Sequence, residues 1–195
     1  LNISGANISQ NSARINMFAG VSYFQLYQNE KDQTKKYEYL TIADQYMDKS
    51  LKIFPDYGQG LNMKAGILAE WHKKDNNTAA FLKGIIPVVE RRPDLTFVND
   101  YLAYLNKNPS NASVLLPFYR QIGYDVLYKK KRRYDFAIQY LTSAKELNPN
   151  NPEILKQLSE IYTSYAGSAG VSAKDASDYR TMAQNLLNQI NLIPK

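Results

Sequence analysis

Apolar and small residues recur along this chain at spacings that fit one face of a helix. Two segments carry them at identical distances before a proline: Leu40, Ala43, Met47, Ser50 and Ile53 before Pro55, and Tyr134, Ala137, Leu141, Ala144 and Leu147 before Pro149. Spacings of three and four place side chains on one helical face, and proline cannot continue a helix. The pattern predicts two equivalent amphipathic helices, with looser copies before Pro93 and Pro194.

Each of these helices follows a segment in which a small residue stands between two larger ones. The four examples are Asn16/Gly20/Tyr23, Leu61/Ala65/Leu68, Tyr119/Gly123/Val126 and Leu155/Ser159/Tyr162. A small residue on a helical face lets a neighbouring helix approach closely. We therefore expect antiparallel helix pairs that bury Gly20, Ala43, Ala65, Gly123, Ala137 and Ala144 at their crossings. An ordinary helical bundle whose small residues coincide by chance is the alternative.

Paired helices, small residues at the crossings and a proline after the second helix resemble the tetratricopeptide repeat, which is usually about 34 residues long. Four irregular repeats fall near residues 9–57, 58–93, 110–151 and 152–195, and a further short helix falls near 94–107. The resemblance implies one all-α domain over residues 1–195. Its expected shape is a right-handed superhelix whose concave groove is lined mainly by the first helix of each pair.

The repeats depart from the pattern in three ways. Phe81 and Met182 stand where a small residue is expected, and Pro87 should kink its helix or remove a hydrogen bond. The small-residue positions of the first and last pairs are also far apart in sequence. We therefore expect stretched helices or inserted turns in those two pairs.

The composition leaves little room for catalysis or metal binding. A chain with 44% hydrophobic and 22% charged residues is ordinary for a globular protein. Cysteine is absent and His72 is the only histidine, which excludes thiolate and multi-histidine zinc sites. No phosphate-binding loop or hydrolase motif occurs. We expect a non-catalytic segment without a cofactor or metal, with His72 as a packing or surface residue.

Tyrosine and arginine indicate a candidate binding site. Arg120, Tyr124 and Tyr128 share one helical face at intervals of four. The repeat resemblance directs this face into the groove, together with Asn62, Lys156 and Glu160. Tyrosine and arginine are enriched at the energetic centres of protein interfaces. The sequence thus predicts a groove that binds a protein or peptide, and a partly buried packing face is the alternative.

The net charge of +6 is concentrated near the expected turns within helix pairs. We call these residues the basic edge: Lys35, Lys36, Lys73, Lys74, Lys129, Lys130, Lys131, Arg132 and Arg133. Such clusters suit contact with anionic lipid headgroups, and a solvated surface is the alternative. Nucleic acid is not expected, because no recognised nucleic-acid module is present. We expect the edge to lie on a different surface from the groove.

The stretch from Asn11 to Leu68, with "NSARINMFAGVSYF" and the later "PDYG", resembles the soluble repeat region of bacterial membrane glycosyltransferases related to the tetratricopeptide-containing protein O-mannosyltransferases. This resemblance implies an extracytoplasmic part of a longer membrane protein; a cytoplasmic location is the alternative. The leading hypothesis is a non-catalytic protein- or peptide-binding scaffold. Its rival is an accessory domain that binds the acceptor or glycan of such an enzyme.

Overall fold

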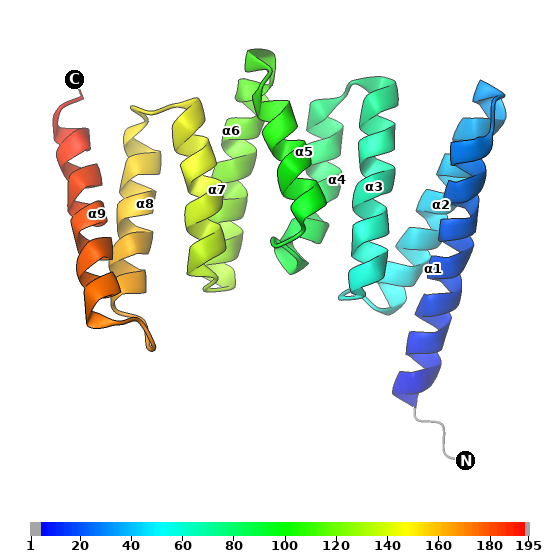
Figure 1. The fold of residues 1–195 in the computed structure, drawn as a ribbon, viewed down its shortest axis with the longest axis horizontal. Coiled ribbons are helices and arrows are strands. Elements are labelled where there is room, and N and C mark those ends of the chain that lie inside the picture. Colours follow the sequence, from blue (N-terminus) through cyan, green and yellow to red (C-terminus); the bar gives the residue numbers. More distant parts are fainter. Residues whose placement is uncertain (1–4, 194–195) are drawn as a thin grey trace. The chain divides into compact units, whose positions relative to one another are not determined.

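A computed structural model describes residues 5–193 of the chain, which are almost entirely helical and contain no β-strand within that range (Figure 1). The helices are α1 (Gly5–Asn29), α2 (Gln33–Ile53), α3 (Gly58–Asp75), α4 (Thr78–Arg91), α5 (Thr96–Asn106), the short 3₁₀ helix η1 (Pro109–Asn111), α6 (Ala112–Arg120), the π-helix η2 (Gln121–Lys130), α7 (Tyr134–Leu147), α8 (Pro152–Ala166) and α9 (Ala173–Asn191). The expected all-α class is therefore confirmed.

The chain divides into two compact units, Leu1–Tyr101 and Leu102–Lys195, with the boundary inside α5. We call them the N-terminal and C-terminal units. The N-terminal unit contains α1 to α4 and the first half of α5. The C-terminal unit contains the rest of α5 and the helices that follow it. Each unit has its own buried core, and each is described separately below.

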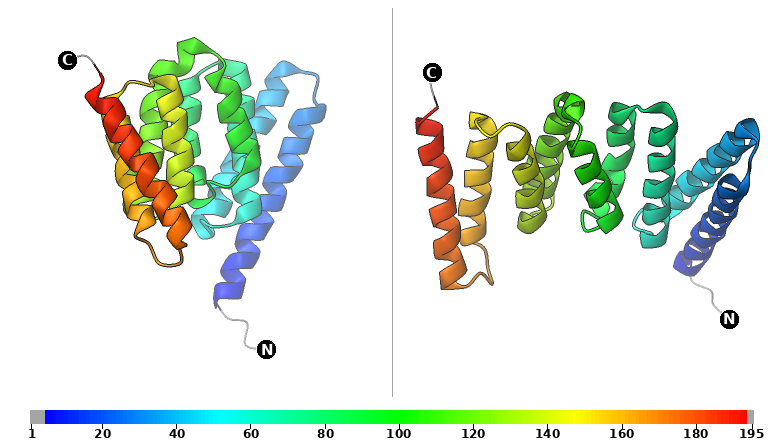
Figure 2. Two further views of the ribbon diagram at one scale, coloured as in Figure 1. Left: turned by 60° about the vertical axis from the view of Figure 1, so that its left-hand side comes forward. Right: turned by 45° about the horizontal axis from the view of Figure 1, so that its top comes forward.

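In the N-terminal unit, α1 and α2 run antiparallel and lie side by side along their length (Figures 1 and 2). Asp32 caps α2 by accepting a hydrogen bond from the Lys35 backbone N–H at 2.9 Å. Gly20 of α1 packs closely on Met47 and on the backbone of Ala43. The two helices have 25 and 21 residues. Stretched helices, and not an inserted turn, thus explain the long spacing in this pair.

The helices α3 and α4 form the second antiparallel pair of this unit. Gly84 of α4 allows the Leu68 side chain of α3 to approach its backbone closely. Pro87 does not break α4, which continues to Arg91. Because proline has no N–H, its helical hydrogen bond is lost, which was the milder of the two expected effects. Phe81 fills its core position with a large ring that is 3% exposed.

In the C-terminal unit, α6 and η2 form one continuous helical rod that packs on α7, and α8 packs on α9. The Ser159 hydroxyl donates to the Ala183 carbonyl of α9 at 3.1 Å. Ala183 is buried, whereas Met182 is 45% exposed. The predicted placement of Met182 at the crossing is therefore wrong by one residue. The connection between α8 and α9, residues 167–172, supplies an inserted turn.

All six small residues that were expected at helix crossings are buried. They are Gly20, Ala43, Ala65, Gly123, Ala137 and Ala144. Gly123 lies against α7, where an added Cβ would stand 3.0 Å from Leu141 Cγ and 3.1 Å from the Ala137 carbonyl oxygen. The predicted burial is confirmed at all six positions, and close approach of the helices is shown where Gly20 meets Ala43 and where Gly123 meets Ala137.

The π-helix η2 was not predicted. This segment has ten residues, and in a π-helix each N–H bonds to the carbonyl five residues earlier, whereas an α-helix uses the carbonyl four residues earlier. At its end, the Lys131 N–H donates to the Val126 carbonyl at 3.1 Å. Pro117, which lies just upstream in α6, has no N–H to continue the α-helical ladder. The rod ends at Arg132, whose φ of 54° is left-handed and stops the helix.

The close crossing at Gly123 predicts that a larger residue there will destabilise the protein. Gly123→Leu should lower the free energy of unfolding by about 1 to 3 kcal/mol, because α7 cannot move away without losing its own core contacts. Urea denaturation measures this change. Gly66→Leu is the matched control, because an added Cβ at Gly66 meets no atom within 4 Å. Equal midpoints for the two variants would contradict the packing.

Candidate functional site

Glu160 of α8 is the centre of a network that joins α8 to η2. Its carboxylate accepts hydrogen bonds from the Tyr124 hydroxyl at 2.5 Å, the Tyr128 hydroxyl at 3.1 Å and the Lys129 ammonium at 2.5 Å. The Tyr128 hydroxyl also lies 2.7 Å from the Ser164 hydroxyl, one turn further along α8. Three donors from η2 thus converge on one carboxylate of α8, and we call this group the Glu160 network.

The π-helical geometry of η2 explains why these three donors share a face. A π-helix has about 4.4 residues per turn, so side chains four and five positions apart both lie within roughly 50° of the starting direction. In an α-helix a residue five positions on would point roughly 140° away. Lys129 stands five positions after Tyr124, and its ammonium lies 5.0 Å from the centre of that ring. The wider turn therefore brings Lys129 into the network.

Arg120 extends this surface at the junction of α6 and η2. Its guanidinium pairs with Glu153 of α8 at 2.9 Å and with Asp125 of η2 at 3.2 Å. All three side chains are at least one-third exposed. The Arg120 contacts and the Glu160 network together fix η2 against α8 at two points.

The structure brings together four of the six residues that the sequence predicted for the groove. These are Arg120, Tyr124, Tyr128 and Glu160. Lys156 is exposed on α8 and takes no part in the contacts described here. Asn62 belongs to the N-terminal unit, where it lines a separate hollow with Gln59 and Arg92.

Two expectations about this surface are wrong. Tyr128 is only 3% exposed, so it supports the site from below and does not face a partner. Lys129 was assigned to a basic edge separate from the groove, yet it pairs with Glu160. The π-helical turn accounts for Lys129, which it directs toward α8, whereas Tyr128 is buried because its hydroxyl contacts both Glu160 and Ser164 of α8.

The basic edge also differs from the expected set of turn residues. Lys35 and Lys36 lie in the first turn of α2, and Lys73 and Lys74 lie in the last turn of α3. Lys129 and Lys130 end η2, which leaves residues 131–133 in the turn itself. The helices include more of these basic residues than we expected from the sequence, because a capping residue such as Asp32 determines where a helix begins.

Electrostatics favour the charged form of the Glu160 carboxyl. Burial alone would raise its pKa, but hydrogen bonds from Lys129, Tyr124 and Tyr128 outweigh burial and lower the pKa below its usual range. Burial and the hydrogen bond to Glu160 raise the pKa of Tyr124, so its hydroxyl stays protonated as a donor. The hydrogen bond to Glu160 raises the pKa of Lys129. The network is therefore fully formed at neutral pH.

Aromatic rings lie beneath several cations of the basic edge, an arrangement that the sequence did not reveal. In the N-terminal unit, the Lys74 ammonium lies 4.3 Å from the Tyr37 ring centre and 4.8 Å from that of Trp71, the only tryptophan. In the C-terminal unit, the Arg132 guanidinium lies 5.4 Å from the Tyr128 ring centre. Such cation–π contacts hold the cations near the surface while leaving their charge available.

His72 is a packing residue in this structure. It is 7% exposed, with Nδ1 at 3.0 Å from the Tyr101 hydroxyl and Nε2 at 3.1 Å from the Thr78 hydroxyl. Burial lowers its pKa, which favours the neutral ring. Both ring nitrogens therefore have hydrogen-bond partners, and His72 links α3 to α4 and α5.

The described residues include neither a candidate metal site nor a helix that could cross a membrane. Within residues 5–193, no three His, Cys, Asp or Glu side chains gather so that they could hold a metal ion. Every helix in that range is too short or too polar to span a bilayer. No protein-family model matches the chain, and no curated protein matches it in sequence.

The lowered pKa of Glu160 predicts a pH-dependent contribution to stability. This contribution should be fully present above the unfolded-state pKa, about 4.3 for glutamate, and should be lost as the pH falls through the lower folded-state pKa. Glu160→Gln should therefore be less stable than the parent protein at pH 7. Urea denaturation between pH 7 and pH 3 should show this difference shrinking with acid.

Glu38→Gln removes an exposed glutamate of α2 and controls for the loss of one negative charge. A stability difference for Glu160→Gln that stays constant down to pH 3, or that matches the control, would contradict the network's role.

Proposed function

We propose that the chain is a tetratricopeptide-like scaffold without catalytic activity, and that its C-terminal unit binds a protein or peptide segment. Antiparallel pairing, burial of small residues at the crossings and the repeated proline positions support the repeat assignment. By this proposal the pairs are repeats of a right-handed superhelix, and in the C-terminal unit the first helices of the pairs, α6 with η2 and α8, line its groove. Attachment to a membrane glycosyltransferase is supported only by the sequence resemblance.

The observation that carries the proposal is the fixed array of Arg120, Tyr124 and Glu160 on two neighbouring first helices. Tyr124 is held by a 2.5 Å hydrogen bond to Glu160, while its ring is partly exposed. A side chain that is already ordered loses little entropy on binding, so it makes an efficient anchor. Arg120 adds an exposed cation flanked by Asp125 and Glu153. This mixture of charge and aromatic surface suits a polar peptide with an apolar or aromatic anchor.

The test begins with selection of peptides on the parent protein from a displayed random library. For the tightest peptide, Tyr124→Ala and Arg120→Ala should each raise the Kd about 30-fold, equivalent to about 2 kcal/mol, as expected of central anchors. Titration calorimetry measures the Kd. Gln139→Ala changes an exposed residue of α7, the second helix of its pair, and should leave the Kd unchanged.

Arg120 and Tyr124 also connect the α6–η2 rod to α8, so each variant must be shown to fold. Far-UV circular dichroism and urea denaturation provide this check. If folded Tyr124→Ala and Arg120→Ala proteins bind the peptide as tightly as the parent protein does, the proposed recognition surface is wrong.

A second candidate function is contact with an anionic membrane surface through the basic edge. The observation that favours it is the cluster of exposed cations at Lys130, Lys131 and Arg132, together with the pairing of Lys74 with the partly exposed ring of Trp71. Tyrosine and tryptophan prefer the headgroup region, and each basic residue near an anionic surface contributes about 1 kcal/mol of attraction. By this proposal the membrane contact is electrostatic and peripheral.

Replacing Lys130, Lys131 and Arg132 with glutamine should reduce sedimentation with phosphatidylserine vesicles by at least about tenfold at low ionic strength. Lys129 is left intact, because its loss would also disturb the Glu160 network. The control is a triple replacement of the exposed lysines Lys49, Lys52 and Lys83, which removes the same charge. Equal losses of vesicle binding in the two triple variants would show that binding depends on net charge and not on the basic edge. If the parent protein does not sediment with the vesicles, membrane contact through the basic edge is excluded.

A further inference from the structure

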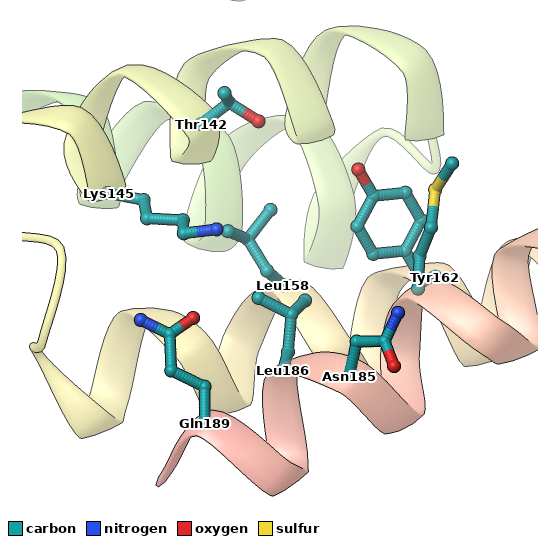
Figure 3. A pocket seen from close by; sticks show the side chains of 8 residues that line it. Thr142, Lys145, Leu158, Tyr162, Asn185, Leu186 and Gln189 are labelled. Carbon is teal, nitrogen blue, oxygen red and sulfur yellow. The ribbon is translucent and has the colours of Figure 1, made fainter. Parts of the chain in front are cut away.

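A pocket of about 290 Å³ lies between α7, α8 and α9 of the C-terminal unit (Figure 3). Its lining comprises Thr142 and Lys145 of α7, Leu158 and Tyr162 of α8, and Met182, Asn185, Leu186 and Gln189 of α9. Leu158 and Leu186 lie next to each other and form an apolar floor, and the polar side chains stand around them (Figure 3). The pocket thus combines an apolar base with a polar rim, as ligand sites commonly do.

Lys145 is the only charged residue of the pocket lining in the described part of the chain, which includes no carboxylate. Its side chain extends from α7 across the pocket toward Leu158 (Figure 3). The residue is half-buried, and the ion pairs of this unit involve Arg120 and Lys129 instead. An ammonium that stands beside an apolar floor, in a pocket whose described lining includes no carboxylate, favours a bound anion.

The remaining polar groups suit a ligand that carries oxygen acceptors. Burial, together with the neighbouring Tyr179, raises the pKa of Tyr162, so its hydroxyl is protonated and can donate. Asn185 turns its amide nitrogen toward the pocket (Figure 3). Gln189 is held in place because its amide donates to the Pro149 carbonyl at 3.0 Å. Lys145, Tyr162 and Asn185 therefore offer three donors above the leucine floor.

This pocket is separate from the Glu160 network, although both use α8. Leu158 and Tyr162 face α7 and α9, whereas Glu160 and Ser164 contact η2. Residues two positions apart on an α-helix point in nearly opposite directions. Occupation of the pocket therefore does not require the peptide-binding surface proposed above.

We propose that this pocket binds a carboxylate that is attached to an apolar group of amino-acid size. The carboxylate pairs with the Lys145 ammonium and accepts hydrogen bonds from Tyr162 and Asn185. The apolar group rests on Leu158 and Leu186. A volume of about 290 Å³ is just below the range of roughly 300 to 1,000 Å³ for ligand pockets, which limits the occupant to about one residue. A free N-acyl amino acid and the C-terminal residue of a peptide share this chemistry.

The test titrates the ¹⁵N-labelled protein with N-acetyl-leucine and with its uncharged analogue N-acetyl-leucinamide, and follows amide chemical shifts. N-acetyl-leucine should shift the resonances of residues lining the pocket, and the leucinamide should bind at least about tenfold more weakly because it lacks the charge that pairs with Lys145. Lys145→Met should raise the Kd for N-acetyl-leucine by a similar factor. Lys174→Met changes an exposed lysine of α9 that is not part of the pocket lining, and as the matched control it should have no effect.

A tetrapeptide ending in leucine distinguishes the two sources of the carboxylate. Tighter binding of the tetrapeptide than of N-acetyl-leucine identifies a peptide C-terminus, and the reverse identifies a free acid. The proposal is overturned if N-acetyl-leucine produces no shifts at the pocket up to about 10 mM, a weak affinity for a built site. It is also overturned if the leucinamide binds equally well to the parent protein, a comparison that does not depend on the folding of any variant.

Discussion

Close approach of paired helices at small side chains is the constraint on which both units depend. In each pair the backbone of one helix lies near the other, as at Gly20 against Ala43 and at Gly123 against Ala137. At this distance a serine hydroxyl can reach a facing carbonyl, which Ser50 does with Ala13 at 2.8 Å and Ser159 does with Ala183 at 3.1 Å. These hydrogen bonds set the register of a pair, because a shift along the axis would leave a buried hydroxyl without its acceptor.

The position of Tyr124 and Lys129 follows from that register. With Gly123 fixed against α7, the next residues of η2 must face α8, and the wide π-helical turn brings Tyr124, Tyr128 and Lys129 to one carboxylate. Two features therefore produce the network. Close packing fixes Gly123 against α7, and the π-helical turn brings the donors after Gly123 onto one face. An α-helical continuation would place Lys129 away from Glu160.

Much of the fold could be predicted from the sequence, because helix periodicity and small residues are local signals. The spacing around Ala137, Ala144 and Gly123 indicated which faces are buried. The π-helix could not be predicted, because its only local sign is Pro117, and a proline more often ends or kinks a helix than widens it. This one difference explains why Lys129 was assigned to another surface. Tyr128 was misjudged for a different reason: its spacing shows that it shares a face with Tyr124, but not that this part of the face is buried.

The two faces of α8 differ in how their charges are balanced, and this difference decides what each can bind. Glu160 already accepts hydrogen bonds from three donors, so a partner gains little by bonding to this carboxylate. A partner at this surface would instead contact the Tyr124 ring and the partly exposed Arg120. On the opposite face, Lys145 lies in a pocket whose described lining includes no carboxylate. The first face offers an ordered surface of balanced charge, which suits shape and stacking. The second offers a cation with no carboxylate in the described pocket lining, which favours an anionic ligand.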